Sequence, residues 1–174
     1  MGSSGQTFVL NQRLTSLSGD LSIEDEQGNQ VYFVDGKAFS LRRRHQLLDA
    51  SGTVVYEIVQ SLGHVHRTFE IRHAGQVVAT VQQALLTILG DRFTVSLADG
   101  EELIVHGDLL DYEFRIERQG VEVIVASRSL INIRDSYGIR VEPGFDVGLA
   151  LAIVIALQQA EQEQRLGFGT SMHH

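Results

Sequence analysis

Hydrophobic and polar residues alternate along most of the chain between positions 7 and 141. Phe93, Val95 and Leu97 share one face of their segment, while hydroxyl-bearing residues occupy the positions between them. The same period of two recurs in 114–117. Such alternation over short segments is typical of strands that bury one face. The pattern therefore predicts a mainly β chain of about a dozen short strands.

Turn signals separate these segments at short intervals. Each contains a glycine, which permits positive φ, and most contain an aspartate, which can bond to nearby backbone amides. They fall at 25–28, 35–36, 49–52, 73–75, 99–100, 119–120 and 135–138. Many short antiparallel strands with one polar face form either a sandwich or a closed barrel.

The segment after Pro143 decides between these two architectures. Asp146 is a plausible N-cap, and the apolar run 147–157 is followed by a Gln/Glu-rich continuation to Glu163. A helix over this segment is apolar on every side, so it has to be buried all round. Its apolar part is only about 16 Å long, too short to cross a bilayer core of about 30 Å. We therefore predict a closed antiparallel barrel of about twelve strands around a buried C-terminal helix.

Length and composition fit one soluble domain. The chain has 174 residues, of which 43% are hydrophobic, so a core can form without disulfides or a structural metal. It contains no Cys, which excludes thiol chemistry and cysteine-based zinc sites. A net charge of −8 argues against a nucleic-acid partner. We expect a domain over 7–163, with flexible tails at 1–6 and 164–174.

The N-terminus lacks the basic start and apolar core of a secretory signal, and no stretch has the 18 or so continuous apolar residues of a membrane span. The expectation is a cytoplasmic protein with no transmembrane segment, peripheral to a membrane if it binds lipid.

Several segments taken in order resemble the LURP-one-related family. They are Phe39-Ser40-Leu41 with the arginines that follow, the 48–52 turn, the hairpin around Gly75, the stretch 107–116, the stretch 135–141, and Asp146 with its apolar helix. Together they cover most of 7–160. Each piece alone is a common strand or turn, and the ordered set ending in a hydrophobic helix carries the resemblance.

This resemblance implies a fold similar to the tubby C-terminal domain and the phospholipid scramblases, in which twelve antiparallel strands enclose a hydrophobic helix. Tubby domains bind phosphoinositide head groups, and scramblases are linked to lipid movement. Scramblases also carry a Cys-rich lipidation segment, which this chain lacks. Because a shared fold does not carry function, the resemblance implies a binding or scaffold module rather than a defined activity.

The densest positive cluster is Lys37 with Arg42, Arg43 and Arg44, followed by His45. On a strand, Arg42 and Arg44 project to the same side, about 7 Å apart, and can clamp a phosphate or another anionic group. We predict that these residues bind an anionic phospholipid or phosphoinositide head group. The alternative is a solvated barrel face whose arginines pair with carboxylates.

His64 and His66 lie on one strand face, a spacing that can chelate a metal if a third group joins. Glu70 or His73 could be that group, which would permit a metal-dependent hydrolase. The alternative is a polar outer face without metal.

His106 with Asp108 and Asp111 could form an acid/base cluster, but glycine and aspartate here are also typical of a turn. The stretch 135–137 is interpreted as a tight corner before the last strand. The sequence has neither a nucleophile-elbow motif nor a phosphate-binding glycine loop. We therefore expect no enzymatic activity, no catalytic residues and no cofactor. The partner is expected to be an anionic membrane lipid, or alternatively a protein to which the domain contributes structurally.

Overall fold

The computed structural model describes residues 4–11, 20–36, 44–61, 68–84, 92–134 and 136–171, with side chains described except at positions 84, 92 and 163–171. Within these residues the chain forms twelve strands, a short 3₁₀ helix and one α-helix. The elements are β1 (Gln6–Asn11), β2 (Leu21–Glu24), β3 (Gln30–Asp35), β4 (Arg44–Asp49), β5 (Val54–Ser61), β6 (Thr68–His73), β7 (Gln76–Ala84), β8 (Arg92–Leu97), β9 (Glu102–Asp108), β10 (Glu113–Arg118), β11 (Val121–Ser127), η2 (Arg128–Leu130), β12 (Ser136–Val141) and α1 (Val147–Ser171).

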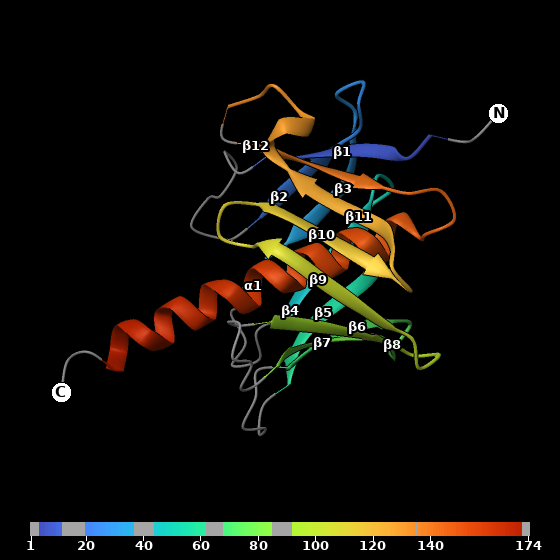
Figure 1. Ribbon diagram of the computed structural model, residues 1–174. Coiled ribbons are helices and arrows are strands. Elements are labelled where there is room, and N and C mark those ends of the chain that lie inside the picture. The colour runs from blue at the N-terminus through green and yellow to red at the C-terminus, as the bar shows by residue number, and fades with distance from the viewer. Residues whose placement is uncertain are drawn as a thin grey trace.

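The strands form one closed antiparallel barrel. Each strand pairs with its neighbours in sequence, and β1 closes the ring by pairing with β12, from Gln6 opposite Val141 to Asn11 opposite Ser136. Closure removes free sheet edges over most of the ring. Figure 1 shows the strands wrapped around α1. The predicted twelve-stranded barrel is confirmed.

The alternating segments place their apolar residues inside the barrel. Phe93 and Val95 of β8 are buried, as are Phe114 and Ile116 of β10. In β9, Leu103 is buried while the next residue, Ile104, is 51% exposed on the outer face. The alternation of apolar and polar residues therefore predicted correctly which face of these strands is buried, because successive side chains of a strand point to opposite sides.

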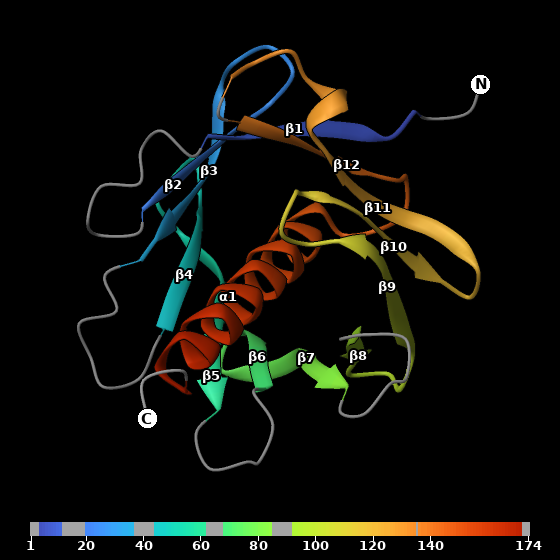
Figure 2. The same ribbon diagram turned by 60° about the vertical axis from the view of Figure 1, so that its left-hand side comes forward.

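The predicted hydrophobic helix runs through the barrel. Every residue from Ala150 to Leu157 has an exposed fraction of 1% or less, and α1 packs against β5, β6, β7 and β12. Figure 2 shows α1 surrounded by strands on all sides. The helix is buried all round, as its composition predicts, because the closed sheet supplies apolar side chains from every direction.

Asp146 caps the start of this helix. Its Oδ1 accepts a hydrogen bond from the Leu149 amide at 2.7 Å and a second from the Tyr56 hydroxyl at 3.0 Å. The first bond satisfies an amide that has no partner within the helix, and the second ties the cap to β5. Burial, followed by the nearby charge of Asp146, raises the pKa of Tyr56, so this hydroxyl remains a donor at neutral pH.

α1 continues to Ser171, past Glu163, where the sequence prediction ended the domain. Gln, Glu, Arg and Leu continue the segment and all favour helix. At the other terminus, β1 begins at Gln6 rather than in a tail. The domain boundaries 7–163 stay a prediction.

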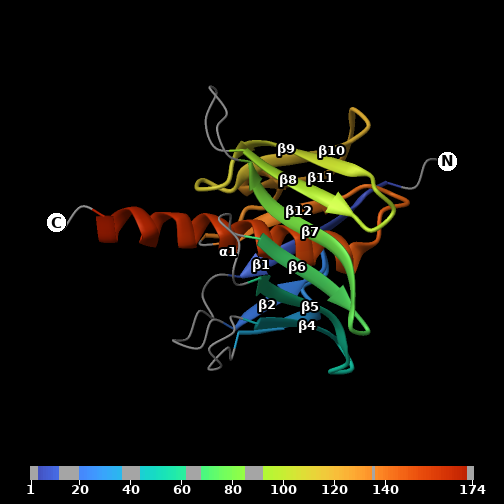
Figure 3. The same cartoon turned by 90° about the horizontal axis from the view of Figure 1, so that it is seen from below.

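The barrel has two different ends. We call the end with the β12–α1 connection, residues 142–146, the helix-entry end, and the opposite end the helix-exit end. Figure 3 shows the C-terminal part of α1 projecting beyond the strands at the helix-exit end. Because the strands alternate in direction, the β2–β3, β4–β5 and β8–β9 turns lie at the helix-entry end, and the β9–β10 and β11–β12 connections lie at the helix-exit end.

Candidate functional site

Only Arg44 of the predicted basic cluster falls within the described residues. It begins β4 at the helix-exit end, and its Nη1 lies 3.2 Å from Oε2 of Glu57 on the neighbouring strand. Its side chain is 43% exposed, so one face of the guanidinium still reaches solvent. Lys37, Arg42 and Arg43 lie outside the described residues, and their role stays a prediction.

The helix-exit end also carries two arginines that the sequence prediction did not single out. Within the described side chains, most arginines have a carboxylate within 4.0 Å, as is the case for Arg44, Arg72, Arg115, Arg118 and Arg140. Arg128 and Arg134 have no such partner there, and both belong to the β11–β12 connection. Arg128 instead lies over the ring of Tyr112, 5.4 Å from its centroid. These two guanidinium groups therefore have no ion pair within the described residues, although the Glu113 carboxylate lies nearby and accepts a hydrogen bond from the Arg128 amide at 2.9 Å.

A polar cluster lies where α1 leaves the barrel. The Tyr137 side chain is 1% exposed, and its hydroxyl donates to Oε1 of Gln158 on α1 at 2.6 Å. The ring of Tyr112 stacks on that of Tyr137 with 4.4 Å between centroids. Burial, with a smaller contribution from Tyr112, raises the pKa of Tyr137, so its hydroxyl stays protonated and donates. The cluster ties α1 to β12 by a directional bond inside an otherwise apolar core.

Nε2 of Gln158 is buried and has no partner among the described residues. Gln158 lines a cavity of about 80 Å³ together with Tyr112, Leu109, Leu110, Glu161 and Gln162. This volume admits a few waters at about 30 Å³ each, which would satisfy the amide.

Tyr137→Phe is expected to lower the free energy of unfolding by about 1–3 kcal/mol, because Oε1 of Gln158 then loses its donor inside the barrel. Urea denaturation followed by circular dichroism measures this change. Tyr112→Phe is the matched control. Its hydroxyl has no hydrogen bond within the described residues, so we expect a change within about 0.5 kcal/mol. Equal losses in the two variants would contradict the importance of the Tyr137–Gln158 bond.

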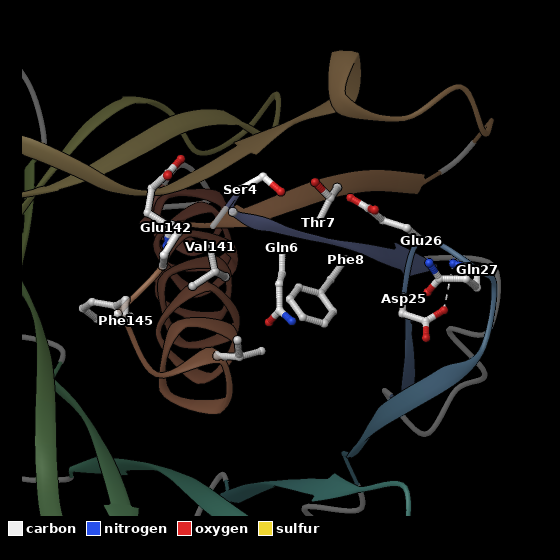
Figure 4. A pocket seen from close by; sticks show the side chains of 14 residues that line it. Ser4, Gln6, Thr7, Phe8, Asp25, Glu26, Gln27, Val141, Glu142 and Phe145 are labelled. Carbon is white, nitrogen blue, oxygen red and sulfur yellow. Dashed lines mark hydrogen bonds between the residues drawn. The ribbon is translucent and has the colours of Figure 1, made fainter. Parts of the chain in front are cut away.

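A pocket with a volume of about 560 Å³ opens at the helix-entry end. It is bounded by the start of β1 with the residues before it, by the β2–β3 turn, and by the β12–α1 connection (Figure 4). Its apolar lining consists of Phe8, Val141, Pro143, Phe145 and Val147. This volume lies within the range of about 300–1,000 Å³ that ligand sites occupy.

Carboxylates surround this pocket, and no described cation lines it. The carboxylates belong to Asp25, Glu26 and Glu142. Asp25 accepts from the Asn29 side chain and from the amides of Gln27 and Asn29, which lowers its pKa and fixes the β2–β3 turn. Glu142 pairs with Arg140 at 3.0 Å, whereas Glu26 is exposed and has no hydrogen bond or ion pair within the described residues. The pocket suits an uncharged or positively charged ligand.

The structure describes two of the four residues proposed as metal ligands, Glu70 and His73. His64 and His66 lie outside the described residues, in the segment between β5 and β6. Glu70 pairs with Arg72, and Nδ1 of His73 lies 2.8 Å from the Val55 carbonyl oxygen. His73 ends β6 at the helix-entry end, while β6 begins at Thr68 at the other end. In the described part of the chain, no three His, Asp or Glu residues form a group that could hold a metal.

The residues of the possible acid/base cluster point to different partners. Nε2 of His106 lies 3.2 Å from Oε2 of Glu117. Oδ1 of Asp108 accepts from the amides of Leu110 and Asp111 at 2.8 and 3.2 Å. Asp108 therefore stabilises the β9–β10 turn, as the alternative interpretation of this stretch holds.

The stretch 135–137 enters β12. Asp135 is outside the described residues. Ser136 begins the strand, is buried, and its hydroxyl donates to Oδ1 of Asn11 on β1 at 2.7 Å. Tyr137 belongs to the buried cluster described above, so these two side chains hold β12 to β1 and to α1.

Comparison with known proteins agrees with this architecture. A model of the LURP-one-related family matches residues 6–158. The chain belongs to the LURP-one-related family. It is 28% identical over 151 residues to the uncharacterized protein YxjI of Bacillus subtilis (strain 168), covering 86% of this chain and 90% of that one. It is 21% identical over 174 residues to the protein LURP-one-related 15 of Arabidopsis thaliana, covering 90% of this chain and 80% of that one.

An X-ray structure of a protein from Arabidopsis thaliana has the same fold. It superposes with a TM-score of 0.66 at 19% identity, covering 89% of this chain and 91% of that one. The family resemblance stated from the sequence is thus confirmed, and so is the barrel with its central helix.

Proposed function

We propose that this domain binds anionic phospholipid or phosphoinositide head groups through Lys37, Arg42, Arg43 and Arg44. Membership of the LURP-one-related family and the barrel fold indicate a non-enzymatic module. The observation that carries the lipid proposal is the run of four cations without an acidic residue at 37–44, in a chain of net charge −8.

The basic segment is connected to the helix-exit end. Residues 37–43 join Gly36 to Arg44, and both of these flank strand ends at the helix-exit end. The stretch 37–44 holds four cations and no acidic residue in a chain of net charge −8. Arg128 and Arg134, which lack a carboxylate partner among the described residues, belong to a connection at the same end.

The helix-exit end also carries carboxylates, those of Asp20, Asp35, Asp108, Asp111 and Glu113. The helix-entry end has carboxylates as well. Asp25, Glu26, Asp49, Glu142 and Asp146 belong to its turns and to its helix connection. An anionic membrane attracts the basic stretch 37–44 and repels the carboxylates, so the proposal predicts that the domain approaches the membrane with this stretch. Each basic residue near an anionic surface contributes about 1 kcal/mol, so the three cations of 37–44 other than the ion-paired Arg44 contribute about 3 kcal/mol at moderate ionic strength.

This proposal gives the domain a peripheral place at a membrane that faces the cytoplasm, where anionic lipids are exposed. In the described part of the chain, no helix has both the length and the apolar character needed to cross a bilayer. A surface contact through arginine side chains requires no insertion of the barrel.

The test is sedimentation with vesicles of phosphatidylcholine containing either cardiolipin or a phosphoinositide. Arg42→Glu/Arg44→Glu is expected to lower the affinity at least about tenfold, because the variant removes two attractive charges and adds two repulsive ones. Pure phosphatidylcholine vesicles should bind neither protein, and binding of the unaltered domain should weaken as salt is raised.

Arg115→Glu/Arg118→Glu is the matched control. It changes the net charge equally, but at β10, on side chains that pair with Glu117 and Glu101. Thermal unfolding verifies that each variant is folded. Equal recovery of the unaltered protein and Arg42→Glu/Arg44→Glu on anionic vesicles would refute the lipid site and leave a protein partner as the alternative.

A further inference from the structure

The first half of β1 has a strand partner on one side only. β12 pairs with all six residues of β1, from Gln6 to Asn11. On the other side β2 pairs with Val9, Leu10 and Asn11 alone, ending at the pair Val9–Glu24. Within the described residues, no strand lies beside Gln6, Thr7 and Phe8 on the β2 side.

The β2–β3 turn creates this gap and keeps it open. The chain leaves β2 after Glu24, and the Asp25 amide bonds the Asn29 carbonyl at 2.9 Å while the Gly28 amide bonds the Asp25 carbonyl at 3.0 Å. The Asp25 carboxylate fixes the same turn through Gln27 and Asn29. Residues 25–27 therefore cannot continue the ladder along β1, and they form one wall of the gap instead.

Backbone groups on this side of Gln6, Thr7 and Phe8 have no strand partner within the described residues. Successive residues of a strand direct their N–H and C=O groups to alternating sides, so about half of those in residues 5–8 face the gap. A strand edge with unpaired backbone groups is a template for an added strand. At about 3.3 Å per residue, the edge over residues 5–8 is about 13 Å long, enough for three or four residues of an extended peptide.

The pocket of about 560 Å³ lies at this edge. Figure 4 shows Gln6 and Phe8 projecting to one side of β1 and Thr7 to the other, with Asp25 and Glu26 across the gap. Phe8, Val141 and Phe145 supply apolar contacts for alternate side chains of a guest strand. Glu26 is exposed and has no hydrogen bond or ion pair within the described residues. Glu142 forms an ion pair with Arg140 through its Oε1 atom.

We infer that this edge binds an extended peptide that carries lysine or arginine, as an added antiparallel strand beside residues 5–8. Backbone hydrogen bonds along β1 provide the affinity. The carboxylates of Asp25, Glu26 and Glu142, with no described cation among the lining residues, select basic side chains over acidic ones. The site is at the helix-entry end and is independent of the lipid proposal.

The test uses fluorescence anisotropy with a labelled, capped hexapeptide of alternating Val and Lys. This peptide is expected to bind saturably, and a Val/Glu hexapeptide at least tenfold more weakly. Two further Val/Lys peptides carry N-methyl groups on every second residue, in the two possible phases. Only one edge of the guest strand faces β1, so one phase should bind normally and the other should lose binding.

Glu26→Lys is expected to weaken binding of the Val/Lys peptide at least fivefold, because it reverses a charge at the pocket. Glu102→Lys is the matched control, since Glu102 is also exposed near the helix-entry end but does not line the pocket. Both variants should unfold at the same temperature as the unaltered domain. Amide NMR shifts on titration should be largest for residues 5–8.

Equal binding by both N-methylated peptides would overturn the proposal, because it would show electrostatic adsorption without strand pairing. Amide shifts confined to another part of the barrel would also overturn it. Self-association of the domain that Glu26→Lys abolishes would assign the edge to a second copy of the chain instead. Loss of vesicle binding in Arg42→Glu/Arg44→Glu has no bearing on these outcomes.

Discussion

Ile153→Asp is expected to abolish cooperative folding. Ile153 is 0% exposed in the middle of α1, and the residues on both sides of it are equally buried. An unpaired carboxylate there loses the burial energy of the isoleucine and cannot keep its hydration, a combined penalty of more than about 4 kcal/mol. This is comparable to the whole stability of a typical domain, about 5–15 kcal/mol. Thermal unfolding by circular dichroism measures the effect.

Two other substitutions on α1 test whether the loss of stability comes from a buried charge at position 153 or from any change in the helix. Ile153→Val keeps the shape of the core and should remove only about 0.5–1.5 kcal/mol. Gln162→Asp introduces the same carboxylate at an exposed position and should leave the unfolding temperature nearly unchanged. A cooperative transition of Ile153→Asp near the unaltered temperature would contradict the burial of α1 inside the barrel.

Gly107→Ala is expected to destabilise the barrel by at least about 2 kcal/mol, because the position combines strain with a steric clash. Gly107 has a φ of 111°, outside the range that L-residues adopt readily. A Cβ atom there would lie 2.4 Å from the Glu113 carbonyl oxygen and 2.8 Å from Cα of Phe114, both on the backbone of β10. Because Gly107 pairs with Phe114, either the β9–β10 ladder or the φ angle must change.

Gly100→Ala provides the comparison. Gly100 has a similar φ of 91°, but a Cβ there meets no atom within 4 Å. It should therefore lose only the conformational contribution of about 1–2 kcal/mol. Urea denaturation of both variants measures the difference. A loss for Gly107→Ala no greater than that for Gly100→Ala would contradict the close approach of β9 to β10.

The faces of the strands and the position of the helix were predictable from local patterns. Phe93 and Val95 alternate with polar residues, and the run around Ile153 has no polar face, so each pattern allows one arrangement. The stagger between β1 and β2 was not predictable. It depends on where the chain leaves β2 at Glu24, and hydrophobic periodicity assigns the face of a residue without giving the offset of its neighbour. The pocket at residues 5–8 follows from that offset.

The candidate sites were predictable only in part, because their partners come from distant parts of the sequence. The basic run ending at Arg44 is visible in the sequence, but its ion pair depends on Glu57, which is brought alongside by the β4–β5 pairing. Arg128 and Arg134 are isolated in the sequence, and only the folded chain shows that neither has a carboxylate partner among the described residues. Tyr137 belongs to a stretch interpreted as a corner, and only the position of Gln158 on α1 explains its burial.

The two proposals assign different binding partners to the two ends of the barrel. At the helix-exit end, the proposed lipid contact rests on the basic stretch 37–44, of which the structure describes Arg44. The helix-entry end carries carboxylates around an open strand edge, which favours a basic peptide. A domain docked on a membrane by its helix-exit end would keep the edge over residues 5–8 free for a partner.

The orientation on a membrane tests this account most directly. The chain has no Cys, so one cysteine can be introduced for a polarity-sensitive dye without removing others. Leu110→Cys places the dye at the helix-exit end and Gln27→Cys places it at the helix-entry end, and both positions are exposed. On vesicles containing cardiolipin or a phosphoinositide, the emission of the dye at position 110 should shift to the blue and that at position 27 should not change. A blue shift at position 27 alone, or no shift at either position, would contradict the account.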